Sequence, residues 1–234
     1  MARKPNSEFW NKEYKHGHHL TLSEEPSEDF IKFTRFLSRQ YGGKFLNNHA
    51  SALDLGCGNG RNLIYLAENF GMKGTGLDNS AEAIAQAKKL SEGLPIEYQI
   101  RSIGGNLPIE NASQTLVLDM MTSHFLNDEK RQELRSEILR ALRPDGWLFW
   151  KTFLLDGDLH AKRLLEEHPG KEKGSYIHPK IGVAERVFTE EEIIESLGEK
   201  FTIHKITKSH RHHERAGGKR RSISIYAQKN WVNI

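Results

Sequence analysis

The chain has 234 residues and a mass of 26.8 kDa, which suits one large α/β domain or at most two small ones. Hydrophobic residues make up 37% of the sequence and charged residues 28%, so the chain can bury a core and is not mainly disordered. It has no apolar run of membrane-spanning length and no apolar segment typical of a secretory signal. Its one cysteine, Cys57, excludes an internal disulfide and a cysteine-rich zinc site. These features predict a cytoplasmic globular protein.

Basic residues are concentrated toward the C-terminal end. The whole chain carries a net charge of +3, yet residues 200–221 hold eight basic side chains and one acidic side chain, Glu214. That segment is therefore +7 and the remainder is −4. A basic face of this kind could bind the phosphates of RNA. Such a run more often forms the solvated face of a strand and a loop.

The first 155 residues show alternating secondary structure. Hydrophobic spacing predicts amphipathic helices within residues 1–40, and Ser27 is a candidate cap for the second helix. Short apolar strands and helices then alternate, which implies crossover connections and a mainly parallel sheet. The predicted strands are 50–55, 74–77, 96–100, 115–120 and 147–153, and the predicted helices between them are 62–70, 81–90 and 129–142.

The alternation lapses after residue 155. Residues 156–187 are rich in Gly, Lys, Glu and His and are too long for a simple connection, so we expect them to be partly irregular. Thr189 and Glu192 form a capping box that begins a helix to about residue 197. Two further strands, 201–206 and 223–227, are expected to pair as an antiparallel hairpin around 216–219.

We expect a single domain with four parts. An N-terminal helical cap covers residues 1–45, and the core follows at 46–155. An insertion at 156–187 is a candidate lid over the site. A C-terminal helix and hairpin occupy 188–234.

Three glycines stand at alternate positions where the first strand ends and a helix begins, at Gly56, Gly58 and Gly60. They allow a sharp turn and let a ligand lie against bare backbone, facing the positive end of the helix. Asp54 precedes them, and Asp78 ends the next strand. An acid at the second position is placed to accept hydrogen bonds from ribose hydroxyls.

The spacing distinguishes two classes of ligand. In the dinucleotide fingerprint the third glycine comes one position later. A carboxylate at Asp54 would crowd a pyrophosphate, but it could orient a cationic amino-acid group. A nucleoside that carries a charged amino acid therefore fits better than a dinucleotide.

Further motifs follow in a set order. They are Gly-Leu-Asp-Asn at 76–79, Asn-Leu-Pro-Ile at 106–109 and Leu-Arg-Pro-Asp-Gly-Trp at 142–147. With the glycine motif, they resemble the class I S-adenosylmethionine-dependent methyltransferases over about residues 50–155. The resemblance implies an α/β, Rossmann-like, seven-stranded, mostly parallel sheet with an antiparallel last strand and helices on both faces. It also implies S-adenosyl-L-methionine as cofactor and S-adenosyl-L-homocysteine as product.

The resemblance implies roles for particular residues. The glycines would flank the methionine part of the cofactor, Asp78 would hold the ribose, and Asn79 would lie near the adenine. Trp10 and Tyr14, one helical turn apart, could close over the cofactor or belong to the ordinary core. The predicted cofactor-binding residues are Asp54, Gly56, Cys57, Gly58, Gly60, Asp78, Asn79 and Tyr14.

Two departures from the family pattern affect adenine recognition and the fourth strand. No acid lies near residues 102–104, where relatives usually hold the adenine amino group, so backbone carbonyls or Asn106 are expected instead. The fourth strand begins with Gln114 and Thr115, where relatives commonly have Phe-Asp.

The methyl acceptor is expected at the end of the fourth strand, since open α/β sheets hold ligands at strand carboxyl ends. Asp119 and His124 are the candidate catalytic residues. His124 could serve as a base if the acceptor must lose a proton, and Asp119 could position an amine or hydroxyl. Alternatively, His124 caps the next helix and Asp119 packs against the glycine loop. Lys151, near the end of the fifth strand, could line the acceptor pocket or simply pack.

The sequence leaves three functions open. A methyltransferase with a small-molecule acceptor is favoured, because no recognisable RNA-binding module is present. A methyltransferase acting on RNA, such as tRNA, or on protein is the alternative that the basic segment suggests. A non-catalytic S-adenosylmethionine-binding partner protein is the third. Two histidine groups without accompanying cysteine or acidic patterns are expected to lie on the surface and bind no metal; they are His16, His18 and His19, and His210, His212 and His213.

Overall fold

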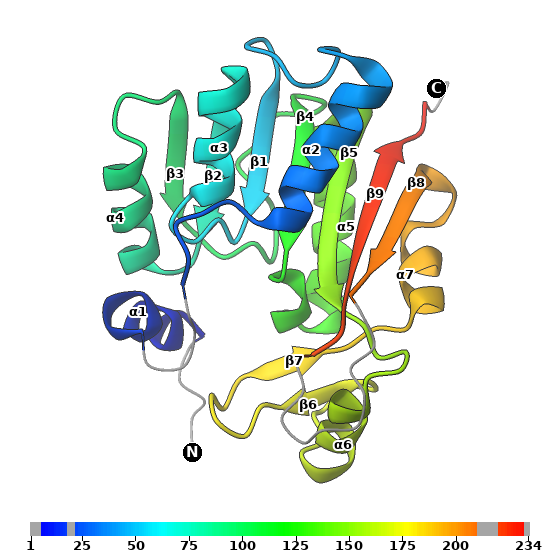
Figure 1. The fold of residues 1–234 in the computed structure, drawn as a ribbon. Helices are drawn as coiled ribbons and strands as arrows, with labels where there is room; N and C mark the ends of the chain where they lie inside the picture. Colours follow the sequence, from blue (N-terminus) through cyan, green and yellow to red (C-terminus); the bar gives the residue numbers. More distant parts are fainter. Residues whose placement is uncertain (1–5, 18–21, 210–219, 232–234) are drawn as a thin grey trace.

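The computed structural model describes residues 6–17, 22–209 and 220–231. Its main feature is a seven-stranded sheet in the order β3-β2-β1-β4-β5-β9-β8 (Figure 1). The strands from β3 to β5 pair in parallel, and β9 runs antiparallel to both of its neighbours, β5 and β8. The strands are β1 (Ser51–Leu55), β2 (Lys73–Asp78), β3 (Ile96–Ile100), β4 (Gln114–Met120), β5 (Leu142–Phe153), β8 (Phe201–Lys208) and β9 (Ser222–Lys229).

Helices cover both faces of this sheet because strand side chains alternate between the faces. Leu116 and Leu118 of β4 belong to the core beneath α2, α3 and α4, whereas Val117 belongs to the core beneath α5 and α7. The predicted fold class is therefore confirmed. The helices are α1 (Asn6–His16), α2 (Glu28–Tyr41), α3 (Arg61–Phe70), α4 (Ala81–Leu90), α5 (Asp128–Ala141), α6 (Leu159–Glu167) and α7 (Glu190–Leu197), with short 3₁₀ turns η1 (Ser123–Phe125) and η2 (Gly198–Lys200).

Aromatic packing fixes α2 on the sheet. Phe33 stacks on Phe149 of β5 at 5.1 Å between ring centroids and meets Tyr226 of β9 edge to face at 4.9 Å. Phe33, Phe149 and Tyr226 are all almost fully buried. This contact ties the N-terminal part of the chain to its last strand and holds α2 against one face of the sheet.

All seven predicted strands are present, and the capping box at Thr189 and Glu192 is confirmed. One local expectation is met only in part. Ser27 occupies the N-cap position of α2, but its side chain makes no capping hydrogen bond, and its backbone N–H donates to the side chain of Asn62. Residues 143–146 lie within β5, where the pairing register with β4 shifts. The predicted turn at 216–219 lies outside the described residues.

The insertion is more ordered than its composition predicts. Residues 156–187 contain α6 and a hairpin of β6 (Ser175–Ile177) and β7 (Ala184–Arg186). A separate small core holds them together, formed by Ala161, Leu164, Tyr176 and Val187. The nine-residue helix α6 was not predicted from the sequence, and the two strands, of three residues each, are too short to show a period.

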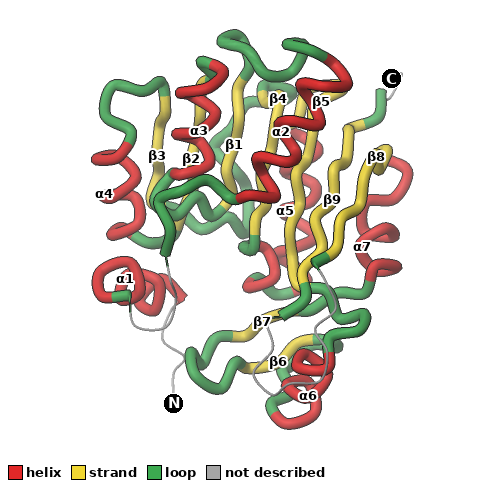
Figure 2. The backbone as a smooth tube through the Cα atoms, in the orientation of Figure 1, coloured by secondary structure: helices red, strands yellow, loops and turns green. Residues whose placement is uncertain are grey.

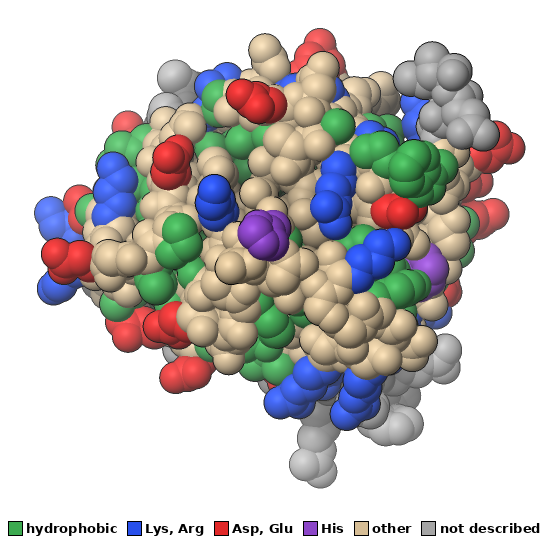
Figure 3. Space-filling view, turned by 90° about the horizontal axis from the view of Figure 1, so that it is seen from above, with side chains coloured by type: hydrophobic (Ala, Val, Ile, Leu, Met, Phe, Trp, Pro, Cys, Tyr) green, Lys and Arg blue, Asp and Glu red, His purple; other side chains and the backbone are tan. Residues whose placement is uncertain are grey.

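The insertion and α1 lie beyond the carboxyl ends of the parallel strands, as the tube view shows (Figure 2). At the opposite end of the molecule, acidic and basic side chains are interspersed over the surface (Figure 3). No helix among the described residues is long and apolar enough to span a bilayer. The fold thus brings α1, the insertion and the strand ends together at one place.

We expect backbone amides of α6, β6 and β7 to exchange hydrogen faster than those of β1, β4 and β5. The insertion has a small core of its own, whereas the central strands are covered on both faces, and local opening needs less free energy where fewer apolar contacts are lost. Hydrogen exchange followed by mass spectrometry measures this. Equal, strong protection of both parts would show that the insertion opens only with the whole domain.

Candidate functional site

The glycine loop between β1 and α3 brings neighbouring side chains against bare backbone. The backbone N–H groups of Gly56 and Cys57 both donate to the carbonyl of Leu77, at 2.7 and 3.0 Å, which ties the loop to β2. Gly58 has a φ of +56°, and a Cβ added there would lie 2.1 Å from the hydroxyl oxygen of Tyr14. A side chain at this position would therefore clash as well as strain the backbone.

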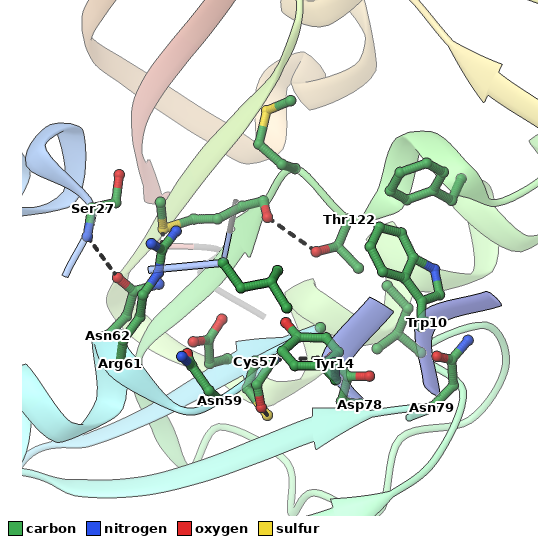
Figure 4. Close-up of a pocket in the computed structure, with 18 of the residues that line it drawn as sticks. Trp10, Tyr14, Ser27, Cys57, Asn59, Arg61, Asn62, Asp78, Asn79 and Thr122 are labelled. Atoms are coloured by element: carbon green, nitrogen blue, oxygen red, sulfur yellow. Dashed lines mark hydrogen bonds between the residues drawn. The ribbon is translucent and has the colours of Figure 1, made fainter. Parts of the chain in front are cut away.

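A cavity of about 260 Å³ lies over this loop, at the carboxyl ends of β1, β2 and β4. Trp10 and Tyr14 reach into it from α1, and Figure 4 shows Tyr14 beside Cys57 and Asp78. On the β4 side the wall includes Met121 and Thr122. We call this space the glycine-loop cavity.

Asp78 links the two turns that form the floor of this cavity. One carboxylate oxygen accepts the backbone N–H of Gly58 at 2.9 Å, and the other accepts that of Ser80 at 2.8 Å. Burial raises the pKa of Asp78, against the lowering effect of these N–H donors. Each carboxylate oxygen has a further lone pair, so Asp78 can still accept hydrogen bonds from a vicinal diol.

Asp54 is a buried acid in the cavity wall, with 1% of its surface exposed. Neither carboxylate oxygen has a donor at hydrogen-bond distance within the described part of the chain; the side-chain amide of Asn62, which donates to the sulfur of Met120, lies close enough to lower the pKa of Asp54. Burial raises the pKa of Asp54 to about 7; the charge of Arg61 opposes this rise and that of Asp78 adds to it. A buried carboxylate without donors is costly, so the site favours a ligand that supplies a cationic, hydrogen-bonding group there.

Helix α1 is fixed over the cavity by polar contacts with α4. The side-chain oxygen of Asn11 accepts from the hydroxyl of Ser80 at 2.9 Å, and Gln86 donates to the backbone carbonyl of Tyr14 at 2.7 Å. Burial, together with the charge of Asp78, raises the pKa of Tyr14. Tyr14 therefore stays a neutral phenol above the glycine loop.

Backbone strain marks the end of β4. Met121 has a φ of 58°, a left-handed conformation that is uncommon for a residue with a side chain. The next residue, Thr122, comes so close to Gly56 that an added Cβ would lie 2.2 Å from its Cγ2. Residues with a strained backbone are common at functional sites, and Met121 lies in the cavity wall.

The structure brings seven of the eight predicted cofactor residues into the cavity wall, and Gly60 is the exception. Gly60 begins α3 in a left-handed conformation, facing the hydroxyl of Tyr98 instead. Asn106 is also outside the wall; its backbone carbonyl accepts from Arg101 at 2.6 Å. Lining residues that sequence reasoning missed are Leu22, Ser23, Asn59, Arg61, Asn62, Arg101, Met120, Phe125 and Leu126.

The two candidate catalytic residues do not line the glycine-loop cavity. Asp119 accepts the backbone N–H of Ser123 at 3.0 Å, and burial raises its pKa to about 6. His124 packs between Phe125 and Phe153, and burial lowers its pKa to about 3. An imidazole with such a pKa is a poor proton acceptor near neutral pH.

The alternative interpretation of His124, as the cap of the next helix, was wrong. Asn127 caps α5, since its side chain accepts the backbone N–H of Lys130. His124 instead lies in the wall of a second cavity that adjoins the first. Of the predicted surface histidines, His16 ends α1, and the other five lie outside the described residues.

Comparison with known proteins agrees with this geometry. Residues 52–146 match the model of a methyltransferase domain family. A carboxy-S-adenosyl-L-methionine synthase from Sulfurimonas denitrificans is 29% identical over 122 residues, which are 51% of this chain and 52% of that protein. The chain spans about half, or less, of the length of the first curated relatives it matches.

Two solved structures show the same fold. A S-adenosylmethionine-dependent methyltransferase from Methanosarcina mazei is 27% identical with a TM-score of 0.66, over 80% of this chain and 95% of that one. The 1,6-didemethyltoxoflavin-N1-methyltransferase from Burkholderia thailandensis, bound to 1,6-didemethyltoxoflavin and S-adenosylhomocysteine, is 19% identical with a TM-score of 0.64, over 94% and 84%.

The sheet order and the glycine-loop cavity thus define a nucleoside-binding α/β domain. Over residues 52–146 the chain matches a methyltransferase domain family, and its fold is that of the class I S-adenosylmethionine-dependent methyltransferases. The residues present fit the cofactor of those methyltransferases, because the unpartnered carboxylate of Asp54 suits its ammonium group and Asp78 suits its ribose diol.

Replacement of Asp78 by alanine is expected to weaken S-adenosylhomocysteine binding by about 1–3 kcal/mol, because charge-assisted hydrogen bonds to the ribose are lost. Titration calorimetry measures this directly. NADH serves as the comparison ligand and is expected not to bind. Tight NADH binding without S-adenosylhomocysteine binding would contradict the assignment of this site.

The raised pKa of Asp54, about 7, predicts a pH dependence of binding. Below this pKa the carboxyl is protonated and lacks the charge that attracts the ligand's ammonium group. S-adenosylhomocysteine affinity should therefore rise by up to about tenfold between about pH 6 and pH 8. Asp54→Asn should abolish the rise.

The matched control is Asp119→Asn. Asp119 is a buried acid with a raised pKa that does not line the cavity, so this variant should keep the rise. A flat profile in the wild-type protein, or one abolished equally by both substitutions, would rule out Asp54 as the ammonium partner.

Proposed function

We propose that the protein transfers the methyl group of S-adenosylmethionine to a small-molecule acceptor. One observation carries this proposal: two acids lie at the glycine loop. Asp54, which is buried, has no hydrogen-bond donor in place among the described residues, and Asp78 accepts the backbone N–H of Gly58. When bound, the cofactor would supply an electrophilic methyl group on a sulfonium. Asp54 would hold its ammonium group and Asp78 its ribose.

The rest of the site would contribute alignment and exclusion of water. Methyl transfer is a direct displacement, so much of its rate comes from fixing donor and acceptor in line. Trp10 and Tyr14 cover the glycine loop from α1, which shields the reacting atoms from solvent. With His124 unprotonated and Asp119 engaged by Ser123, we propose that transfer depends on this alignment rather than on a base from either residue.

The size of the site supports a small acceptor. The glycine-loop cavity adjoins a second cavity of about 680 Å³, and pockets for small molecules commonly measure about 300–1,000 Å³. The solved structure from Burkholderia thailandensis, which shares the fold, holds 1,6-didemethyltoxoflavin as well as S-adenosylhomocysteine.

The RNA alternative loses part of its basis. Arg220 stacks on the ring of Phe153 at 4.0 Å and pairs with Asp158 and Glu185. Arg221 is 6% exposed and donates to backbone carbonyls. Both guanidinium groups are held by contacts inside the protein, so neither is placed to bind a phosphate of RNA. Arg211, Arg215 and Lys219 of the same segment lie outside the described residues.

The protein is added to a cell extract with S-adenosylmethionine whose methyl group is tritiated. We expect the label to enter the small-molecule fraction of the extract and to stay out of the RNA and protein fractions, which are separated by precipitation. Asp78→Ala at the same protein concentration gives the background, because its cofactor site is weakened. Label that enters RNA in the wild-type protein and not in Asp78→Ala would replace the small-molecule proposal with the RNA one.

A further inference from the structure

The second cavity lies between α1, η1 and the insertion. Its walls include Phe9 from α1, Phe125 from η1 and residues 181–186, which lead into and form β7. Phe125 and Leu126 also line the glycine-loop cavity, so the two spaces adjoin across these side chains. We call this second space the hairpin cavity.

One helix contributes a wall to each of the two cavities. Trp10 and Tyr14 are four residues apart on α1 and line the glycine-loop cavity. Glu8 and Lys12, also four residues apart, line the hairpin cavity. Side chains four residues apart share a helix face, so α1 presents opposite faces to the two spaces. The two spaces share Phe125 and Leu126, so a ligand in the hairpin cavity would approach the expected place of the cofactor past these two side chains.

Two buried side chains in the wall of the hairpin cavity have ring or guanidinium nitrogens without partners. His124 is 1% exposed, and neither of its ring nitrogens makes a hydrogen bond within the described chain. Arg131 is 3% exposed and donates to Glu172 at 2.7 Å, while its Nε has no partner among the described residues. Buried polar groups in native proteins normally have partners, and a ligand can supply the missing ones.

The wall carries an excess of positive charge, with four cationic side chains against three carboxylates. Ion pairs engage two of these carboxylates and two of the cations, since Glu172 pairs with Arg131, Glu185 with Arg220 and Arg186 with Glu192. Lys12 and Lys171 are exposed on opposite walls and form no ion pair with another described residue. Apolar groups, including Phe9, complete the wall.

We propose that the hairpin cavity is the methyl-acceptor site and takes a small molecule with an apolar ring and an anionic group. This inference rests on the proposed function. The ring would lie against Phe9 and Phe125, and the anion would be attracted by Lys12, Lys171 and Arg131. His124 would give or accept a hydrogen bond as a neutral imidazole, and it is a positioning group for the acceptor.

Anilinonaphthalene sulfonate, an aromatic anion that fluoresces when bound, is a suitable probe. It is titrated in the presence of saturating S-adenosylhomocysteine, which fills the glycine-loop cavity. Lys12→Glu combined with Lys171→Glu should weaken probe binding by about tenfold, and the effect should shrink with added salt. S-adenosylhomocysteine affinity should not change.

The matched control is Lys15→Glu combined with Lys173→Glu. These lysines are exposed on the same helix and the same segment but do not line the cavity. The control variant has the same net charge and should bind the probe like the wild-type protein. Equal weakening in both double variants, or displacement of the probe by S-adenosylhomocysteine, would overturn the assignment.

His124 gives a second test. His124→Phe removes two partnerless buried nitrogens, so we expect it to raise the midpoint of thermal unfolding by about 2–4 °C. The same variant should reduce label transfer to the acceptor fraction, and His124→Gln, which keeps a hydrogen-bonding group, should restore part of it. A lower melting midpoint for His124→Phe would identify His124 as a structural residue and remove it from the proposal.

The two proposals fail in different ways. If the wild-type protein does not bind S-adenosylhomocysteine, the methyltransferase function fails. If it binds S-adenosylhomocysteine while the probe does not distinguish the two double variants, the function stands and the acceptor site lies elsewhere.

Discussion

The Asp78 carboxylate is the interaction on which the site depends. By accepting the backbone N–H groups of Gly58 and Ser80, it joins the loop after β1 to the start of α4. Ser80 in turn holds Asn11 of α1, so the same short chain of hydrogen bonds fixes the helix that covers the cavity. The position of Tyr14 over bare backbone at Gly58 follows from this arrangement. The side chain of Asp78, at the end of β2, thereby positions the two turns beneath the cavity directly and helix α1 above it indirectly.

This arrangement makes α1 important to both halves of the site. The helix contributes Trp10 and Tyr14 on one face and Lys12 on the other. Trp10 also meets Phe125 edge to face, at 5.2 Å between ring centroids, at the boundary between the two cavities. Under the proposed function, α1 would contact both the cofactor and the acceptor.

The central fold could be predicted from the sequence because its signals are local. Buried strands, glycine turns and acids at strand ends recur at short spacings, and Asp54, Gly56, Gly58 and Asp78 meet where the motif predicts. The hairpin cavity could not be predicted, because its walls come from α1 and from residues 171–186, which are far apart in the sequence. The same holds for His124: its sequence position suggested a base, and its burial between Phe125 and Phe153 determines its protonation. Likewise, the sequence around Arg220 suggests a surface charge, whereas in the structure Arg220 packs against the ring of Phe153.

A crystal structure of the protein with S-adenosylhomocysteine tests the central claim most directly. The account predicts that the ligand's ammonium group lies within hydrogen-bond distance of the Asp54 carboxylate and that its ribose hydroxyls contact Asp78. It also predicts that the sulfur faces the end of β4, toward Phe125 and the hairpin cavity. A ligand bound with its ammonium group away from Asp54, or with its sulfur facing away from Phe125, would contradict the account.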